Sequence, residues 1–428
     1  MTEVLTRPRT RPGRATARAS LGLAPALVTA VAYVDPGNVA TNFSAGSAYG
    51  YGLLWVVVGS TAAAGLVQYL SAKLGSCTGR SLTETVASAV GRRARVAYWV
   101  QAELVAVATD IAEVVGGAVA LKLLFGLPLW AGAGVVAAVS TALLRLRTTR
   151  GENAFAAAIT VALGLIAIGF IACAAFAGPT AGGVLSGMRP LLPDSGAVLL
   201  ASGVFGATVM PHAIYVHSAL SRDGSRWLRA DDPSLPGDPS LPGGIGGTGG
   251  VLSATRRGVV GAMVPAGVIN AALLLTAAAL PAGAGELTLE GVHSTVGAVL
   301  GSLPALALAL ALLVSSLAST AVGTHAGDIA MRDLIRRRVP AGVRRLVALA
   351  PAVLLLAADL DTTHLLVLSQ VGLSLGVPFA LIPLIRLTAR RSVMGGAVNH
   401  RVTTAAASVV VVAAVAVNGF LLVDLALG

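Results

Sequence analysis

The chain has 428 residues, of which 55% are hydrophobic and only 11% are charged. Soluble domains carry about a quarter charged residues, so this composition excludes a protein built of soluble domains. A net charge of +11 would suggest nucleic-acid binding in a soluble protein, but here the basic residues lie in short connectors between apolar runs. We therefore expect no nucleic-acid partner and an apolar surface that the lipid bilayer covers.

Long apolar runs recur along the whole chain. A helix needs roughly 20 apolar residues to cross a hydrocarbon layer of ~30 Å, whereas barrel strands alternate over about ten residues. The runs fit helices, which satisfy their own backbone polar groups in lipid. The fold class is therefore an all-α membrane protein with about 11 transmembrane helices. The predicted spans lie near 21–46, 52–73, 96–122, 127–145, 153–178, 196–220, 257–281, 300–331, 345–358, 364–386 and 402–427.

The distribution of lysine and arginine predicts the orientation of these spans. With eleven spans and a cytoplasmic N-terminus, 28 of the 30 basic residues fall on the cytoplasmic side, and only Lys122 and Arg189 fall outside. This asymmetry is typical of membrane proteins, whose short cytoplasmic loops are rich in lysine and arginine. We predict a cytoplasmic Arg-rich tail at 1–20 and a C-terminus outside the cell.

One connector differs in composition from all the others. Residues 223–250 are polar and rich in glycine and proline, and the hexapeptide Asp-Pro-Ser-Leu-Pro-Gly occurs at 232–237 and again at 238–243. Such a stretch buries too little apolar surface to fold. We predict a flexible cytoplasmic linker there.

The first predicted span contains a polar interruption. Asp35, Pro36, Gly37 and Asn38 follow one another in the middle of apolar sequence. Proline removes a backbone donor and breaks the helix, and polar side chains at that depth are costly unless they face a cavity or a ligand. A proline kink with a solvated aspartate is the alternative interpretation, but a kink requires neither polar residue.

The sixth predicted span has a matching interruption at Met210, Pro211 and His212. If spans one to five and six to ten form two halves, an odd number of spans per half makes their topologies opposite. Interrupted helices at corresponding places in inverted halves indicate the midplane site of a transporter. We therefore predict repeats at 21–178 and 196–386, followed by one extra helix at 402–427.

The two interruptions offer a set of metal ligands. Asp35 supplies a carboxylate, Asn38 an amide oxygen and Met210 a thioether, and the carbonyls of Ala32 and Ala207 lie one turn before each break. Mg²⁺ and Ca²⁺ prefer oxygen ligands, whereas a soft thioether favours later transition metals. The alternative is that Met210 simply fills space in the core.

Three acids of the third predicted span share one helix face. Glu103, Asp110 and Glu113 are spaced by seven and three residues, so at 3.6 residues per turn they form one stripe. Such a stripe in a membrane helix indicates a proton or ion path, with structural pairing to basic residues as the alternative. The unperturbed pKa of a histidine side chain, near 6.5, suits a role of His212 in proton transfer, although a lone buried histidine is more often structural. We expect His217 to be structural.

These motifs resemble those of the Nramp divalent metal transporters, and the resemblance extends from Ala24 to Ile385. Its most specific parts are Asp35-Pro36-Gly37-Asn38, Ala40-Thr41-Asn42-Phe43, the segment from Gln68 to Gly75, and Met210-Pro211-His212. The resemblance implies a LeuT-like fold of two inverted five-helix repeats plus one helix, and proton-coupled uptake of Mn²⁺ or Fe²⁺.

The resemblance also implies roles for single residues. It makes Asp35, Asn38 and Met210 the metal-ligating side chains, together with the Ala32 and Ala207 carbonyls. Gln370 is similar to an accessory polar residue near the metal in that family.

The resemblance extends to a proton route. Arg344 and Arg345 are similar to the family's salt-bridge partners below the acid stripe, which would make Glu103 and Asp110 its exit end. Glu113 and His212 would then lie nearer the metal.

The chain departs from the family pattern at three positions. Ala213 stands where the family usually has asparagine, and His325 and Asp328 lie where the eighth span of the family has tyrosine and glutamine. The predicted ligands are unchanged, but the additional titratable groups could alter proton coupling and gating.

The function favoured by these patterns is proton-coupled import of divalent transition metals across the plasma membrane by alternating access. Mn²⁺ and Fe²⁺ are the expected substrates, with Cd²⁺, Co²⁺ and Zn²⁺ as further candidates. Mg²⁺, or an amino acid with sodium, on the same fold is the alternative, and an intramembrane hydrolase using Asp110 and Asp328 is a remote one. The chain has no phosphate-binding loop for ATP. We expect a monomeric transporter, not an enzyme, with no resident cofactor.

Overall fold

The structure is a computed structural model that describes residues 23–150, 152–231, 247–280, 288–336, 350–356, 358 and 361–427. Side chains are described for these residues except 144–150, 152–153, 226–231, 247–249 and 424–427. The predicted tail at 1–20 lies outside the described residues, as does the central part of the predicted linker.

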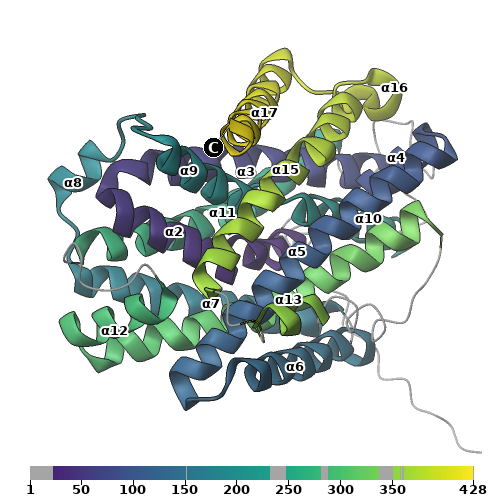
Figure 1. Cartoon of the computed structure of the whole chain (residues 1–428). Helices are drawn as coiled ribbons and strands as arrows, with labels where there is room; N and C mark the ends of the chain where they lie inside the picture. The colour runs from purple at the N-terminus through teal and green to yellow at the C-terminus, as the bar shows by residue number, and fades with distance from the viewer. Residues whose placement is uncertain are drawn as a thin grey trace, which may run out of the picture.

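Within the described residues the protein is helical and contains no strand (Figure 1). The elements are η1 (Val31–Val34), α2 (Pro36–Tyr49), η2 (Gly50–Leu53), α3 (Leu54–Thr78), α4 (Leu82–Ala89), α5 (Arg92–Phe125), α6 (Leu129–Arg150), α7 (Glu152–Ala177), α8 (Ala181–Ser186), α9 (Ser195–Thr208), α10 (Pro211–Asp231), α11 (Gly247–Ala279), α12 (Leu289–Val299), α13 (Ser302–Leu334), α15 (Thr362–Thr388), α16 (Arg391–Met394), η3 (Gly395–Ala397) and α17 (Arg401–Leu427).

The helices match the predicted spans closely. In the described part of the chain, eight helices are long and apolar enough to cross a membrane, and one of these, Pro36–Thr78, includes parts of two predicted spans. Two shorter apolar helices, Leu23–Val34 and Leu129–Leu143, correspond to the start of the first span and to the fourth. The short predicted span at 345–358 is described only at 350–356 and 358.

The predicted linker begins too early and ends too late. Helix α10 continues to Asp231, well beyond residue 223, and α11 already begins at Gly247. The described part of α10 ends at Asp231. The polar residues after 223 therefore extend a helix past the apolar layer.

Helix α13 is one of the central helices of the bundle. It lies along α5 and α7, while α10 packs on α3, and α11 packs on both α2 and α3. Helix α15 packs on α9 and α5, and α17 contacts mainly α15 and α9 at the edge of the bundle (Figure 1). The two interrupted spans therefore lie inside the bundle.

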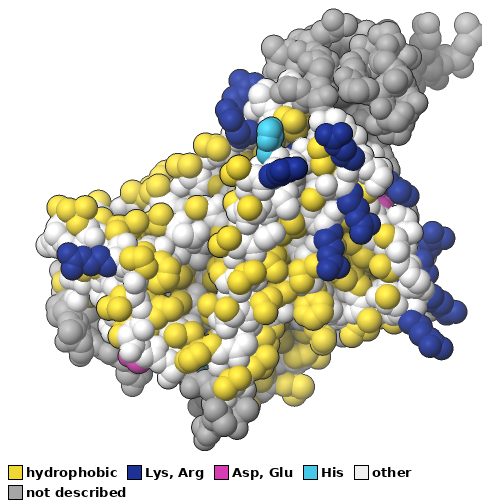
Figure 2. Space-filling model, turned by 90° about the horizontal axis from the view of Figure 1, so that it is seen from above, with side chains coloured by type: hydrophobic (Ala, Val, Ile, Leu, Met, Phe, Trp, Pro, Cys, Tyr) yellow, Lys and Arg dark blue, Asp and Glu magenta, His cyan; other side chains and the backbone are white. Residues whose placement is uncertain are grey.

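The surface separates apolar and basic side chains. Hydrophobic side chains cover much of the face seen in Figure 2, and most visible lysine and arginine side chains gather toward one end. Val161 and Ile168 are exposed in the middle of α7, and Val402 is exposed at the start of α17. This pattern fits a lipid-facing belt bounded by a basic end, as the basic connectors predicted.

An ion-pair cluster joins α4, α10 and α13. The side chain of Arg222 in α10 is only 4% exposed, and its Nη1 lies 2.8 Å from Glu84 Oε1 of α4. Its Nε lies 2.8 Å from Asp223 Oδ1, and Asp333 of α13 approaches Nη1 to 3.8 Å. Arg222 is therefore neutralised by carboxylates from its own helix and from two neighbours.

Candidate metal site between two helix breaks

The first break is built by a local capping arrangement. Residues Val31–Val34 form one turn of 3₁₀ helix, and Asp35 then adopts an extended conformation with φ −69° and ψ 169°. Pro36 occupies the first position of α2, where its missing N–H costs nothing. The Asp35 carboxylate caps α2, because its Oδ1 accepts a hydrogen bond of 2.7 Å from the Asn38 N–H.

The second break has the same proline at its helix start. Helix α9 ends at Thr208, Val209 leaves the helical conformation with φ −104° and ψ 69°, and Pro211 begins α10. Met210 lies between the two pieces and is fully buried. Both interrupted spans thus carry a helix N-terminus inside the bundle, where its partial positive charge faces buried polar groups.

The two breaks are in direct contact. The side-chain amide of Asn38 donates hydrogen bonds to the Ala207 carbonyl at 2.7 Å and to Asp35 Oδ1 at 2.9 Å. These three residues are fully buried. The Asn38 amide therefore links Asp35 at the first break to the last turn of α9, which directly precedes the second break.

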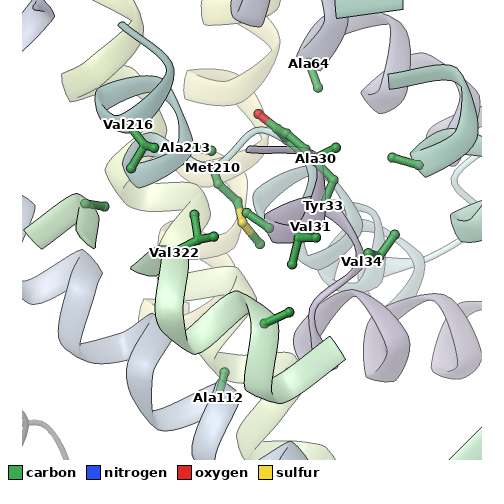
Figure 3. Close-up of a cluster of buried hydrophobic side chains, with 14 of the residues drawn as sticks. Ala30, Val31, Tyr33, Val34, Ala64, Ala112, Met210, Ala213, Val216 and Val322 are labelled. Atoms are coloured by element: carbon green, nitrogen blue, oxygen red, sulfur yellow. The ribbon is translucent and has the colours of Figure 1, made fainter. Parts of the chain in front are cut away.

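Met210 extends from the second break toward the first. Figure 3 shows its side chain running from the residue just before α10 toward Val31 of η1, with Val322 of α13 beside it. The Ala32 residue of η1 is also buried. The thioether thus lies in the region where the two interrupted spans meet, within a cluster that is otherwise mostly apolar.

Gln370 of α15 reaches both breaks because two glycines leave room for it. A Cβ atom on Gly37 would lie 1.8 Å from Gln370 Nε2, and a Cβ atom on Gly206 would lie 2.2 Å from the Gln370 carbonyl oxygen. The Gln370 side chain is fully buried. It therefore packs directly against the start of α2.

Three buried oxygen atoms at this place lack a hydrogen-bond partner among the residues that the structure describes: Asp35 Oδ2, Asn38 Oδ1 and Gln370 Oε1. An acceptor buried without a partner costs about 1–3 kcal/mol, so such atoms mark a place where a ligand is expected. Three oxygens and a neighbouring thioether suit a cation of intermediate softness. No group of three or more His, Cys, Asp or Glu side chains in the described ranges forms another candidate.

Helix α5 carries its acids to the first break. A Cβ atom on Gly116 would lie 2.0 Å from Pro36 Cβ, so the two backbones touch. Glu113, one turn earlier, is fully buried, and its Oε1 accepts a hydrogen bond of 2.8 Å from Ser319 Oγ of α13. Ser319 thus fixes the carboxylate of Glu113 one turn of α5 before Gly116, the residue that touches Pro36.

Glu113 and Asp110 face the same glycine of α13. A Cβ atom on Gly323 would lie 3.3 Å from both carboxylate oxygens of Glu113 and 3.6 Å from Asp110 Oδ1. Glu103 lies two turns further along α5 and is partly buried. Glu113 and Asp110 therefore share the face of α5 that meets α13, which agrees with the predicted stripe for these two acids.

His212 connects α5 to the second break. Its Nδ1 lies 3.4 Å from Thr109 Oγ1, and the histidine side chain is 2% exposed. Because Gly116 touches the first break and Thr109 the second, α5 contacts both. Thr109 was not identified from the sequence, although its position directly before Asp110 was a signal.

The remaining predicted residues are only partly described. Arg344 and Arg345 lie outside the described residues. In α13, His325 is buried and Asp328 is half-buried, and in α10 Ala213 is fully buried next to His212.

Sequence reasoning also missed a buried amide network behind the first break. Asn270 of α11 donates from Nδ2 to the Tyr33 carbonyl at 2.8 Å, and Asn42 donates to the Asn38 carbonyl at 2.8 Å. These bonds satisfy carbonyls near the break. The signal was an asparagine inside the apolar run of α11.

His217 belongs to a second hydrogen-bond network, which also involves Tyr33 next to the first break. Its Nδ1 lies 2.5 Å from Gln68 Oε1, and Gln68 Nε2 contacts the Tyr33 hydroxyl. His217 thus joins α10 to α3 and η1, in agreement with the structural role expected for it.

Comparison with known proteins gives consistent matches over most of the chain. The model of the family described as natural resistance-associated macrophage protein-like (Nramp) matches residues 26–424. The divalent metal cation transporter MntH of Mycobacterium tuberculosis is 48% identical over 383 residues, which cover 89% of this chain and 86% of that protein.

Two solved structures extend the comparison. The Eremococcus coleocola manganese transporter, in complex with an aromatic bis-isothiourea compound, is 27% identical with a TM-score of 0.81, covering 96% of this chain and 87% of that one. The nucleobase-cation-symport-1 family transporter Mhp1 is 17% identical with a TM-score of 0.57, covering 88% of this chain and 80% of Mhp1, so this likeness concerns the fold alone.

The contact between Gly37 and Gln370 gives a test of the site geometry. Gly37→Ala should destabilise the protein by about 1–3 kcal/mol, because the new methyl group overlaps the Gln370 side chain. In Gln370→Ala the overlapping atoms are absent, so the double variant should lose less stability than the sum of the two single variants. Thermal unfolding of the four purified proteins measures this coupling, and additive losses would show that the two side chains are not in contact.

Proposed function

This chain belongs to the Nramp family, and we propose that it imports divalent transition metal ions, chiefly Mn²⁺ or Fe²⁺, together with protons. It is a divalent metal cation transporter of the membrane rather than an enzyme. Its fold is the all-α, LeuT-like arrangement of two inverted five-helix repeats and one extra helix. Import, proton coupling and the choice of metal are the parts that we propose.

One observation carries the proposal: two broken helices meet where buried oxygen atoms have no described partner. Asp35 Oδ2, Asn38 Oδ1 and Gln370 Oε1 are such acceptors, and Met210 adds a polarisable sulfur. In this interior a divalent cation would compensate the unpaired acceptors and the buried carboxylate together. The carbonyls of Ala32 and Ala207 are the proposed backbone ligands.

The Asn38 amide occupies part of the place that the metal would take. Its Nδ2 donates to Asp35 Oδ1 and to the Ala207 carbonyl, both of which are proposed ligands. A cation that enters would replace these N–H donors, and rotation of the side-chain amide would direct Oδ1 to the metal. The amide thus stabilises the metal-free site with the same acceptors that bind the ion.

The proposed proton route uses groups that adjoin the metal site. Asp35 and His212 lie at the two breaks, and Glu113 is fixed by Ser319 one turn from the Asp35–Pro36 peptide. Asp110 and Glu103 continue the route along α5 toward the basic end of the molecule, with Arg344 and Arg345 as its proposed partners. The route therefore leaves the metal site along the α5–α13 contact.

The proposed membrane arrangement follows from the distribution of charge. The N-terminus and the basic connectors lie in the cytoplasm and the C-terminus lies outside. The protein acts as a monomer in the plasma membrane, and rocking of its two halves exposes the site to each side in turn. The membrane potential then drives both metal ions and protons inward.

Removal of the buried carboxylate tests the metal site. Asp35→Ala should reduce Mn²⁺ uptake into proteoliposomes to background, because the only predicted anionic ligand is lost. Asp194→Ala is a control for loss of an exposed carboxylate, since Asp194 caps the opposite end of α9 from Ala207 and accepts a hydrogen bond from the Tyr49 hydroxyl. Size-exclusion chromatography checks that both variants fold, and Mn²⁺ uptake by folded Asp35→Ala would refute the site.

Removal of the thioether tests the basis of selectivity. Met210→Ala should retain most Mn²⁺ transport but lose discrimination against Ca²⁺ by roughly tenfold, which corresponds to about 1.4 kcal/mol. Met263→Ala, at a buried methionine of α11, controls for the loss of packing. Competition of Ca²⁺ with Mn²⁺ uptake provides the measurement, and unchanged discrimination in Met210→Ala contradicts the role of the sulfur.

Neutralisation of Glu113 tests the separation of proton and metal paths. Glu113→Gln should weaken proton entry, followed with a trapped pH-sensitive dye, more than Mn²⁺ binding, followed by isothermal titration. The glutamine keeps the acceptor for Ser319 Oγ, so the packing of α5 on α13 should persist. Glu290→Gln, on the short helix α12, is the control. Equal losses of proton entry and Mn²⁺ binding would argue against a separate route.

A further inference from the structure

Four exposed arginines gather where α15 turns back into α17. Arg386 lies in the last turn of α15, Arg390 and Arg391 lie at the start of α16, and Arg401 begins α17. We call these four residues the basic corner. In Figure 1, α16 and the neighbouring helix ends lie at the edge of the bundle. The corner therefore lies where two spanning helices leave the apolar layer.

Within the part of the chain that the structure describes, the basic corner has no internal counter-charge. The sequence contains no Asp or Glu between Asp361 and Asp424. Among the described residues, no carboxylate forms an ion pair with any arginine of the corner, whereas Arg222 is paired with Glu84 and Asp223. The positive charge of the corner is thus available to an external anion.

The turn that carries the arginines is fixed by hydrogen bonds. Asn399 donates from its backbone N–H to the Thr388 carbonyl at 3.0 Å and from Nδ2 to Thr388 Oγ1 at 2.8 Å. Lys73 of α3 donates to Asn399 Oδ1 at 2.8 Å, and Met394 of α16 is buried. A fixed turn presents its cations with little loss of backbone entropy when an anion binds.

Exposed apolar side chains adjoin the corner on both helices. On α15, Phe379 is 55% exposed and Ile382 is 36% exposed, and on α17, Val402 is 79% and Val409 is 68% exposed. A molecule that binds both parts must have an anionic head and long apolar chains.

We propose that the basic corner binds an anionic phospholipid, with the phosphate between the arginines and the acyl chains along the exposed faces of α15 and α17. Arginine suits this role because its planar guanidinium group forms paired hydrogen bonds with phosphate oxygens. Basic pockets between membrane helices bind anionic headgroups in this way. The lipid would hold the peripheral helix α17 against α15.

The test compares two charge-matched variants of the full chain in nanodiscs made of equal parts phosphatidylglycerol and phosphatidylcholine. Arg390→Gln/Arg391→Gln removes two arginines from the corner, and Arg92→Gln/Arg93→Gln removes two exposed arginines from the start of α5. Lipids that remain bound after the protein is released from the nanodisc are counted by native mass spectrometry, and Mn²⁺ uptake into proteoliposomes checks that each variant folds.

The unaltered protein should retain phosphatidylglycerol in preference to phosphatidylcholine. The corner variant should lose this preference by on the order of 30-fold, the effect of removing two cations beside an anionic headgroup, and the α5 variant should keep it. An absent preference in the unaltered protein, or an equal loss in both variants, would overturn the proposal, because either result would show only general surface charge.

Discussion

The hydrogen bond from the Asn38 amide to the Ala207 carbonyl unites the two interruptions on which the rest of the structure depends. Inside a membrane protein, each backbone group released by a broken helix must find a partner within the protein. Asn38 supplies a donor to one such carbonyl, and Asn270 supplies another to Tyr33. The contact between the breaks therefore satisfies one of their backbone carbonyls and also gathers the acceptors that a cation needs.

Close contact around the breaks depends on residues without side chains. Gly37 admits the Gln370 side chain, Gly206 admits the backbone of α15, and Gly116 brings α5 onto Pro36. A larger residue at any of these positions would separate the helices and move their polar groups from the site. Small residues serve this purpose in membrane proteins, where packing and buried hydrogen bonds hold helices together.

The charges are divided between the interior and one end of the molecule. Buried carboxylates such as Glu113 lie along the α5–α13 contact, whereas arginines gather at the basic end. Arg222 is neutralised within the protein, whereas no carboxylate among the described residues pairs with the basic corner at α15 and α17. Arginine thus has two uses in this protein. Arg222 joins neighbouring helices by ion pairs, and the arginines of the basic corner face an anionic partner.

The sequence by itself determined the helical class, the positions of both breaks and the shared face of the α5 acids. These follow from apolar run length, from proline and glycine, and from the 3.6-residue period, all of which are local properties. Only the tertiary structure decided that Asn38 donates to Ala207, that Thr109 lies beside His212, and that Asn270 supports the first break. Helical periodicity defines a face but not the helix that it meets, and each of these contacts joins residues more than one hundred positions apart.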